Sequence, residues 1–227
     1  MDPGDERRDR AEARGDHADR RDHQPTYFQP QAAAAKAAGI PIITVLNEDL
    51  TQPMGPEVTA RVAQPYDLAA RLSVDFIVKD TNCAANVLVL TSKEVIGSPA
   101  SIDAVNDEFK KYCPPNCRTT FQNVSVPDWS TQITNITRSA IQSDPTINYV
   151  MPLYDSMSQF VVPGIQLAGA TGKVHISTFN GTPFVLKMMQ DADVVKMDVG
   201  GEPVAGRVRS HRPDRAHPLR SRPDRLG

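Results

Sequence analysis

The feature that most constrains the fold is a regular alternation of strand-like and helix-like segments between Gln31 and Val199. The expected strands are Ile42–Leu46, Val58–Ala63, Val87–Leu90, Thr119–Val124, Ile147–Met151, Val174–Phe179 and Asp193–Val199. The expected helices are 31–38, 67–79, 100–112, 128–142, 156–168 and 182–190. Strands and helices that alternate at this spacing form parallel βαβ units with right-handed crossovers. We therefore expect an α/β protein with a Rossmann-like, doubly wound parallel sheet.

Three local patterns give sharper expectations. The uninterrupted apolar run Ile42–Leu46 is typical of a buried strand. Asp128 precedes a helical segment, and its carboxylate is placed to accept hydrogen bonds from the free N–H groups of the first turn. Within the helix 67–79, one apolar stripe is expected to face the core: Leu68, Leu72, Phe76 and Ile77.

The two ends of the chain differ in composition from its middle. Residues 1–30 contain six arginines and eight acidic residues, residues 203–227 contain seven arginines and two acidic residues, and neither end contains lysine. Three interpretations compete: disordered tails, a basic arm at Arg207–Arg225 that binds phosphates or acidic lipid, and out-of-frame translation of GC-rich DNA. The bias toward arginine without lysine and the abrupt boundaries favour the third. We therefore treat residues 31–202 as the interpretable protein, with tails at 1–30 and 200–227.

Charge and hydropathy exclude several classes of protein. The formal net charge is −2, which disfavours a protein that coats nucleic acid. The sequence has no apolar run of about 18 residues, so we expect no membrane span. Residues 1–22 are charged throughout and lack the apolar core of a signal peptide.

The motifs of the common catalytic and cofactor sites are missing from the sequence. It contains no HExxH, paired CxxC, GxSxG, GxxxxGK[ST] or GxGxxG motif. His175 stands alone inside an expected strand, which is typical of a satisfied core histidine rather than of a metal ligand. The sequence thus predicts a protein that is not an enzyme and has neither a cofactor nor a metal.

In an open parallel sheet, ligands bind beyond the carboxyl ends of the strands. Polar and aromatic side chains at these positions are Asn47, Trp129, Tyr154, Asp155 and Asn180. Each has two open roles. Trp129 is either a stacking platform for a flat ligand face or a packed residue in the helix–strand seam. Asp155 either binds ligand hydroxyls, as the Tyr154 phenol could, or caps the next helix; the two asparagines either bind a polyol or form Asx turns.

Cys113 and Cys117 flank the segment Pro114-Pro115-Asn116. Their short spacing favours a small disulfide loop, and hence an oxidising compartment, over a reduced pair. Cys83 has no partner in this interpretation.

The order of several segments resembles the type I periplasmic binding proteins. The segments are KAAGIPIITV (36–45), VLVLTSKEVIGSPASIDAVNDEF (87–109), VPDW (126–129), YVMPLYDSMSQFVVPGIQLAG (149–169), HISTFNGTP (175–183) and VVKMDVG (194–200). They are similar to the solute-binding proteins of sugar-importing ABC transporters, which are related to ribose-binding protein and to the ligand domain of lactose-repressor-like regulators. The resemblance implies two Rossmann-like lobes that close on a small ligand about a hinge, here Ala63-Gln64-Pro65.

The resemblance also implies that the chain is incomplete. Residues 31–63 correspond to a fragment of the N-terminal lobe and residues 64–199 to a nearly complete C-terminal lobe. Where the family returns to the first lobe, this sequence has its arginine- and proline-rich end, a basic tail at 200–227.

The ligand-binding positions of the family match unevenly. Candidates carried over by the resemblance are Asn47, Gln64, Ser98, Asp103, Trp129, Tyr154, Asp155 and Asn180. The family's usual Asn-Asp pair is Tyr154-Asp155 here, and its frequent Asp before the Gly-Thr-Pro turn is Asn180. A common ligand-binding arginine in the helix that starts at Ser98 has only Asp103 or Val105 at its position.

The resemblance therefore implies a solute-binding component of an ABC importer, with a sugar-like ligand, an ABC permease as partner and an extracytoplasmic location. Weak or absent ligand affinity is expected from an incomplete chain. The alternatives are the ligand-sensing core of a lactose-repressor-like regulator, a protein whose basic tail binds an acidic partner, and a non-functional fragment.

Overall fold

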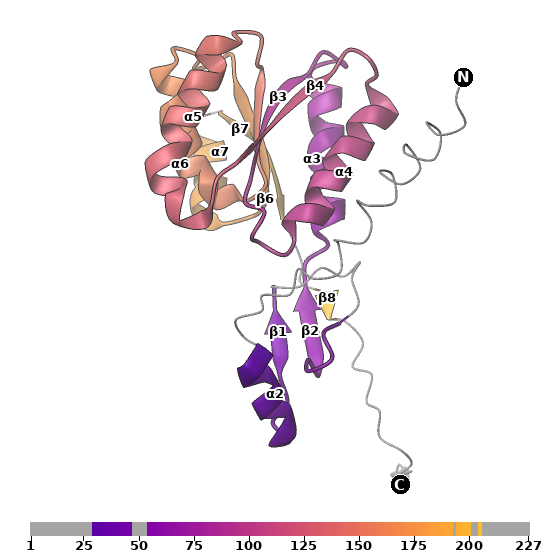
Figure 1. Cartoon of the computed structure of the whole chain (residues 1–227). Helices are drawn as coiled ribbons and strands as arrows, with labels where there is room; N and C mark the ends of the chain where they lie inside the picture. Colours follow the sequence, from indigo (N-terminus) through magenta and orange to yellow (C-terminus); the bar gives the residue numbers. More distant parts are fainter. Residues whose placement is uncertain (1–28, 47–53, 193, 201–203, 206–227) are drawn as a thin grey trace, which may run out of the picture.

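The computed structural model describes residues 29–46, 54–192, 194–200 and 204–205, and most of the expected tails, 1–30 and 200–227, lies outside this part of the chain (Figure 1). The described residues form two sheets, one of five strands and one of three. The five-stranded sheet has the order β4-β3-β5-β6-β7. Its strands are β3 (Asn86–Thr91), β4 (Arg118–Asn123), β5 (Tyr149–Pro152), β6 (His175–Asn180) and β7 (Val195–Gly200). All four strand pairs are parallel, which confirms the expected Rossmann-like sheet.

Helices cover both faces of the five-stranded sheet (Figure 1). One face carries α3 (Tyr66–Asp80) and α4 (Ser98–Tyr112), and the other carries α5 (Trp129–Ser143), α6 (Ser158–Leu167) and α7 (Pro183–Ala192). Short 3-10 helices, η3 (Val126–Asp128) and η4 (Asp155–Met157), precede α5 and α6. Because both faces are covered, every residue of β3 is buried. No helix among the described residues has the length and hydropathy needed to cross a membrane.

The smaller sheet contains β1 (Ile43–Val45), β2 (Ala60–Ala63) and β8 (Val204–Ala205), and α2 (Gln29–Ala37) precedes it. β1 and β2 are parallel, whereas β8 runs antiparallel to β2. The two residues of β8 belong to the range expected to be a tail. They extend the small sheet because the free backbone groups at the edge of β2 accept a partner strand.

The expectation that Ile42–Leu46 is a buried strand is wrong. Ile43 is 61% exposed and Val45 is 60% exposed. An apolar run is buried only where other layers cover it, and among the described elements only β2 makes extensive contact with β1.

The inward stripe expected for α3 is also wrong in part. Ile77 is buried, but Leu68 and Leu72 are 50% and 41% exposed. The helix instead turns a flatter face inward, formed by Tyr66, Ala69, Ala70, Ser73, Val74 and Ile77. Small side chains let the helix approach the sheet closely enough for Ser73 Oγ to donate to the Thr178 carbonyl at 3.2 Å.

Asp128 does not cap α5 as expected. The 3-10 turn η3 gives Asp128 a helical backbone conformation instead of the extended one of an N-cap residue, and its side chain makes no cap hydrogen bond. Its Oδ2 accepts from Ser125 Oγ at 2.6 Å.

His175 differs from the expected satisfied core histidine. It begins β6 half-buried, with its ring 5.9 Å from that of Tyr149, and its Nδ1 is buried without a hydrogen-bond partner among the described residues. At this strand end the imidazole packs on the Tyr149 ring, and its Nδ1 is left without a hydrogen bond among the described residues.

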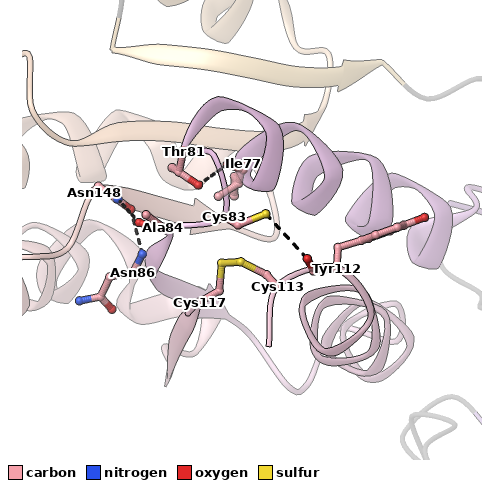
Figure 2. Close-up of a disulfide and its surroundings, with 9 residues drawn as sticks. All are labelled: Ile77, Thr81, Cys83, Ala84, Asn86, Tyr112, Cys113, Cys117 and Asn148. Carbon is pink, nitrogen blue, oxygen red and sulfur yellow. Dashed lines mark hydrogen bonds between the residues drawn. A yellow bond between two sulfur atoms is a disulfide. The ribbon is translucent and has the colours of Figure 1, made fainter. Parts of the chain in front are cut away.

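The expected disulfide joins Cys113 and Cys117, with a Cα–Cα distance of 5.5 Å (Figure 2). It closes the turn between α4 and β4. Cys83 is a free cysteine, as expected, and its Sγ donates to the Tyr112 carbonyl oxygen at 3.8 Å (Figure 2).

Candidate functional site

The strand order creates a topological switch point between β3 and β5. From β3 the chain crosses outward to β4, and it then crosses the other way to reach β5, β6 and β7. Ligands of open α/β sheets bind in the crevice outside the carboxyl ends of the strands at such a point. The carboxyl edge of the five-stranded sheet also lies toward the smaller sheet (Figure 1). This edge is therefore where a site is expected on topology alone.

Trp129 lies at this edge, directly after η3. Its indole Nε1 donates to Ser92 Oγ at 2.8 Å and to the Val124 carbonyl at 3.2 Å, so the ring orientation is fixed. The indole stacks on the Tyr154 ring, with centroids 6.0 Å apart and an interplanar angle of 21°. The side chain is half-buried. Packing in the seam and partial exposure of the ring thus occur together.

Tyr154 packs between the rings of Trp129 and Phe179. Its ring also meets Phe179 edge-on at 6.0 Å, and its hydroxyl shares a hydrogen bond of 2.9 Å with Ser98 Oγ. Burial raises the pKa of the Tyr154 phenol above its usual range. Ser98 is itself fully buried and donates to the Ser92 carbonyl at 2.6 Å. Tyr154 and Ser98 therefore fix the geometry of the edge from inside.

Asp155 organises the loop between β6 and α7. It is fully buried, and its Oδ2 accepts from the backbone N–H of Thr182 at 2.8 Å. Its Oδ1 accepts from Asn180 Nδ2 at 3.4 Å. The sequence left two roles open for Asp155, binding ligand hydroxyls or capping the next helix. The observed hydrogen bond goes to a backbone N–H, but this N–H lies just before α7 and not at the start of the next helix, α6. Asn180 is thereby brought beside Asp155 on the same edge.

Asp198 on β7 completes this group of polar side chains. Its Oδ1 accepts from the Gly181 N–H at 3.1 Å, while its Oδ2 is buried without a hydrogen-bond partner among the described residues. Burial, with a smaller contribution from the charge of Asp155, raises the pKa of the Asp198 carboxyl to about 6. A carboxyl group with such a pKa changes its protonation state close to neutral pH. It donates a hydrogen bond when protonated and only accepts when ionised.

Gln64 lies in the connection between β2 and α3, half-buried beside a cavity of about 310 Å³. The other lining residues are mostly apolar: Pro65, Leu68, Ala69, Leu72, Phe179, Val199 and Gly200. Nearby, the Tyr66 hydroxyl donates to the Leu46 carbonyl at 2.8 Å, which ties α3 to the end of β1. The connection therefore adjoins both sheets.

The remaining candidates do not join this group. Asp103 lies further along α4 with an exposed side chain, away from the buried start of the helix at Ser98. Asn47 lies outside the described residues. The structure thus brings together Ser98, Trp129, Tyr154, Asp155 and Asn180.

Sequence reasoning missed Ser92 and Asp198 as residues of this edge. Ser92 follows the expected strand Val87–Leu90 by two residues, and its position just beyond the carboxyl end of a strand is the signal that points to it. Asp198 was assigned to the interior of the last strand; an acidic residue two positions from the carboxyl end of a strand is the signal that points to it. No group of three or more metal-ligating side chains occurs among the described residues.

The model of the periplasmic binding protein domain family matches residues 23–206 of the chain. A comparison with curated proteins found no match. Solved structures of similar fold include an ABC transporter periplasmic solute-binding protein from Actinobacillus succinogenes 130z, with a TM-score of 0.60 and 18% identity, covering 78% of this chain and 73% of that one.

Two further solved structures are similar to the chain in fold at low sequence identity. The periplasmic binding protein component of the arabinose ABC transporter from Shewanella sp. ANA-3 has a TM-score of 0.64 and 18% identity over 74% of this chain and 56% of that one. The 5-methylthioribose transporter solute-binding protein from Thermotoga lettingae TMO has a TM-score of 0.65 and 16% identity over 75% of this chain and 51% of that one. The chain thus spans about half the length of these two proteins.

The family match covers most of the chain, and the parallel five-stranded sheet flanked by helices agrees with it. The chain therefore belongs to the periplasmic binding protein domain family and has the type I fold of that group.

Proposed function

We propose that this protein is the solute-binding component of an ABC importer and that it binds a sugar or a similar small polyol. The observation that carries the proposal is the carboxyl edge of the five-stranded sheet, where the half-buried Trp129 ring lies on the same edge as the polar groups of Asn180 and Asp198. A sugar ring has an apolar C–H face and a rim of hydroxyl groups. An aromatic face and a few placed amide and carboxyl groups match both parts.

The solved structures of similar fold support this class of ligand. The Actinobacillus protein contains D-allose, the Shewanella protein contains L-arabinofuranose, and the Thermotoga protein contains 5-methylthioribose. All three ligands are small sugars or sugar derivatives.

The mechanism we propose is hinge closure over the solute. In this proposal residues 64–199 are one lobe and residues 31–63 belong to the other, and Gln64 lies where the chain passes from β2 to α3. Rotation about this connection would bring the two lobes together, and polar side chains at the carboxyl edge would hold the ligand in the closed state. The ligand-contacting residues we propose are Gln64, Trp129 and Asn180, with Ser98, Tyr154, Asp155 and Asp198 behind them.

The partner and location follow from the same proposal. A membrane permease would receive the solute from the closed protein outside the cytoplasm. The Cys113–Cys117 disulfide supports this location, because disulfides persist in oxidising compartments.

Thermal unfolding with monosaccharides tests the proposal. D-allose, L-arabinose and D-fructose are suitable probes, and the amino acid L-alanine at the same concentration is the control. A sugar that binds the folded state at about 100 times its Kd stabilises the protein by about 2.7 kcal/mol and raises Tm. The variant Trp129→Ala should reduce that shift, while Phe184→Ala, which changes an exposed aromatic residue on α7, should leave it intact. An unchanged Tm with every sugar would contradict the proposed function.

A further inference from the structure

The loop from Asn180 to Thr182 has a backbone conformation that needs support. Asn180 has φ 142° and Gly181 has φ 74°, both in the region that L-residues rarely adopt. A Cβ atom on Gly181 would come within 3.2 Å of Gly200 Cα, so the loop is pressed against the end of β7. Such strain persists only where the surroundings hold it, and it is common at ligand sites.

Two carboxylates hold the loop from opposite sides. Asp155, the first residue of η4, accepts from the N–H of Thr182 at 2.8 Å and from Asn180 Nδ2 at 3.4 Å. Asp198, from β7, accepts from the N–H of Gly181 at 3.1 Å. The second oxygen of Asp198 and the hydroxyl of Thr182 are buried and have no hydrogen-bond partner among the described residues. Both carboxylate oxygens of Asp155 therefore accept hydrogen bonds from the loop, whereas only one oxygen of Asp198 does.

We propose that Asp198 is a positioning residue for the solute site: its carboxylate holds the Asn180–Thr182 loop so that the Asn180 amide is presented to the ligand, and its ionisation tunes solute affinity. The inference rests on the proposed function above. The inference goes beyond the proposed function because it assigns control of solute affinity to Asp198 of β7, which acts through the backbone of the loop.

The groups packed around Asp198 determine the pH at which its carboxyl ionises. Asp155 is the charged side chain that acts on it, and the buried residues that α3 and α7 turn toward the sheet, such as Ser73 and Val185, are uncharged. Burial raises the pKa of the Asp198 carboxyl to about 6. An ionised carboxylate accepts from the Gly181 N–H more strongly than a neutral carboxyl does, so the loop is held more firmly above this pH.

Titration calorimetry across pH tests the proposal with the sugar that gives the largest Tm shift. In the wild-type protein, affinity should rise at least about threefold between about pH 5 and about pH 7.5. Asp198→Asn keeps an acceptor but cannot ionise, so its affinity should stay flat at the low-pH value. Asp198→Ala should bind more weakly than either. Asp191→Asn, which removes an exposed carboxylate of α7, is the matched control and should keep the wild-type profile. An Asp198→Asn profile that follows the wild type, or unchanged affinity in Asp198→Ala, overturns the proposal.

A second measurement does not depend on a ligand. The amide resonance of Gly181 in the wild-type protein should titrate with a midpoint near the pKa of Asp198, and it should not titrate in Asp198→Asn. If no sugar binds the wild type, the proposed function fails. In that case a Gly181 titration that disappears in Asp198→Asn still supports the grip of Asp198 on the loop, and a Gly181 amide indifferent to pH overturns it.

Discussion

A strand of the five-stranded sheet is buried, whereas a strand of similar sequence in the three-stranded sheet is largely exposed. β3 and β1 are both short runs of aliphatic and β-branched residues, yet every residue of β3 is buried while Ile43 and Val45 of β1 are 61% and 60% exposed. The difference lies in the layers: helices cover both faces of the five-stranded sheet, whereas β1 makes extensive contact only with β2 among the described elements. Local sequence therefore selects a strand, and the neighbouring layers decide whether it contributes to the core.

Truncating one side chain in each sheet tests this contrast and should give the largest effect. Leu90→Ala in β3 removes a side chain with 0% exposure and should lower the free energy of unfolding by about 3 kcal/mol, because it leaves a cavity. Ile43→Ala in β1 should change it by less than about 0.5 kcal/mol. Urea unfolding followed by circular dichroism measures both. Equal losses in the two variants would show that β1 is covered in solution.

Helix packing around the larger sheet should be the next most sensitive feature. A Cβ atom on Gly164 of α6 would lie 2.7 Å from both the Thr134 carbonyl oxygen and Thr137 Cβ of α5. Gly164→Ala should therefore destabilise the protein by about 2 kcal/mol through overpacking. Gly200→Ala, where an added Cβ meets nothing within 4 Å, is the control for stability. A neutral Gly164→Ala variant in a thermal unfolding experiment would mean that α5 and α6 separate easily.

A smaller, pH-dependent effect should distinguish the contacts that charged side chains make in the two regions. Glu108 on α4 accepts from Arg71 at 2.6 Å and from Lys111 at 3.1 Å, and the hydrogen bond with Arg71 is the main reason that its pKa is lowered. A lowered pKa in the folded state stabilises the protein above the ordinary value of 4.5, and this contribution is lost as pH falls through the folded value. Glu108→Gln should cost about 1 kcal/mol at neutral pH and nothing in strong acid.

The control for this prediction comes from the smaller region. Lys36 donates to the Pro56 carbonyl at 2.8 Å at an exposed position. Lys36→Met should change stability by less than about 0.5 kcal/mol at every pH. The two variants are compared by urea unfolding at neutral and acid pH, and a loss in Glu108→Gln that persists unchanged in acid would contradict the assigned role of the ion pair.

Two features with a dominant local signal were predicted correctly. The two cysteines around Pro114-Pro115-Asn116 form the expected disulfide, and the alternation of strands and helices gave the parallel sheet. Most failures concern residues whose role depends on a distant partner, and Asp128 is the exception because the adjacent 3-10 turn replaces the expected cap. Leu68 is exposed because α3 packs its other face, with Ala69, Ala70 and Ser73, against the sheet, and Asp198 has its role through the loop at Gly181.

The sequence by itself determined the kind of fold, because hydrophobic periodicity and turn residues are local properties that propagate along the chain. It also determined which polar and aromatic residues follow the ends of the strands. The tertiary structure decided the strand order, and with it which of those residues meet: Trp129 comes against Tyr154, and Asp155 and Asp198 converge on one loop. Burial, the raised pKa of Asp198 and the exposure of β1 were decided in the same way, since each depends on what packs against a residue from elsewhere in the chain.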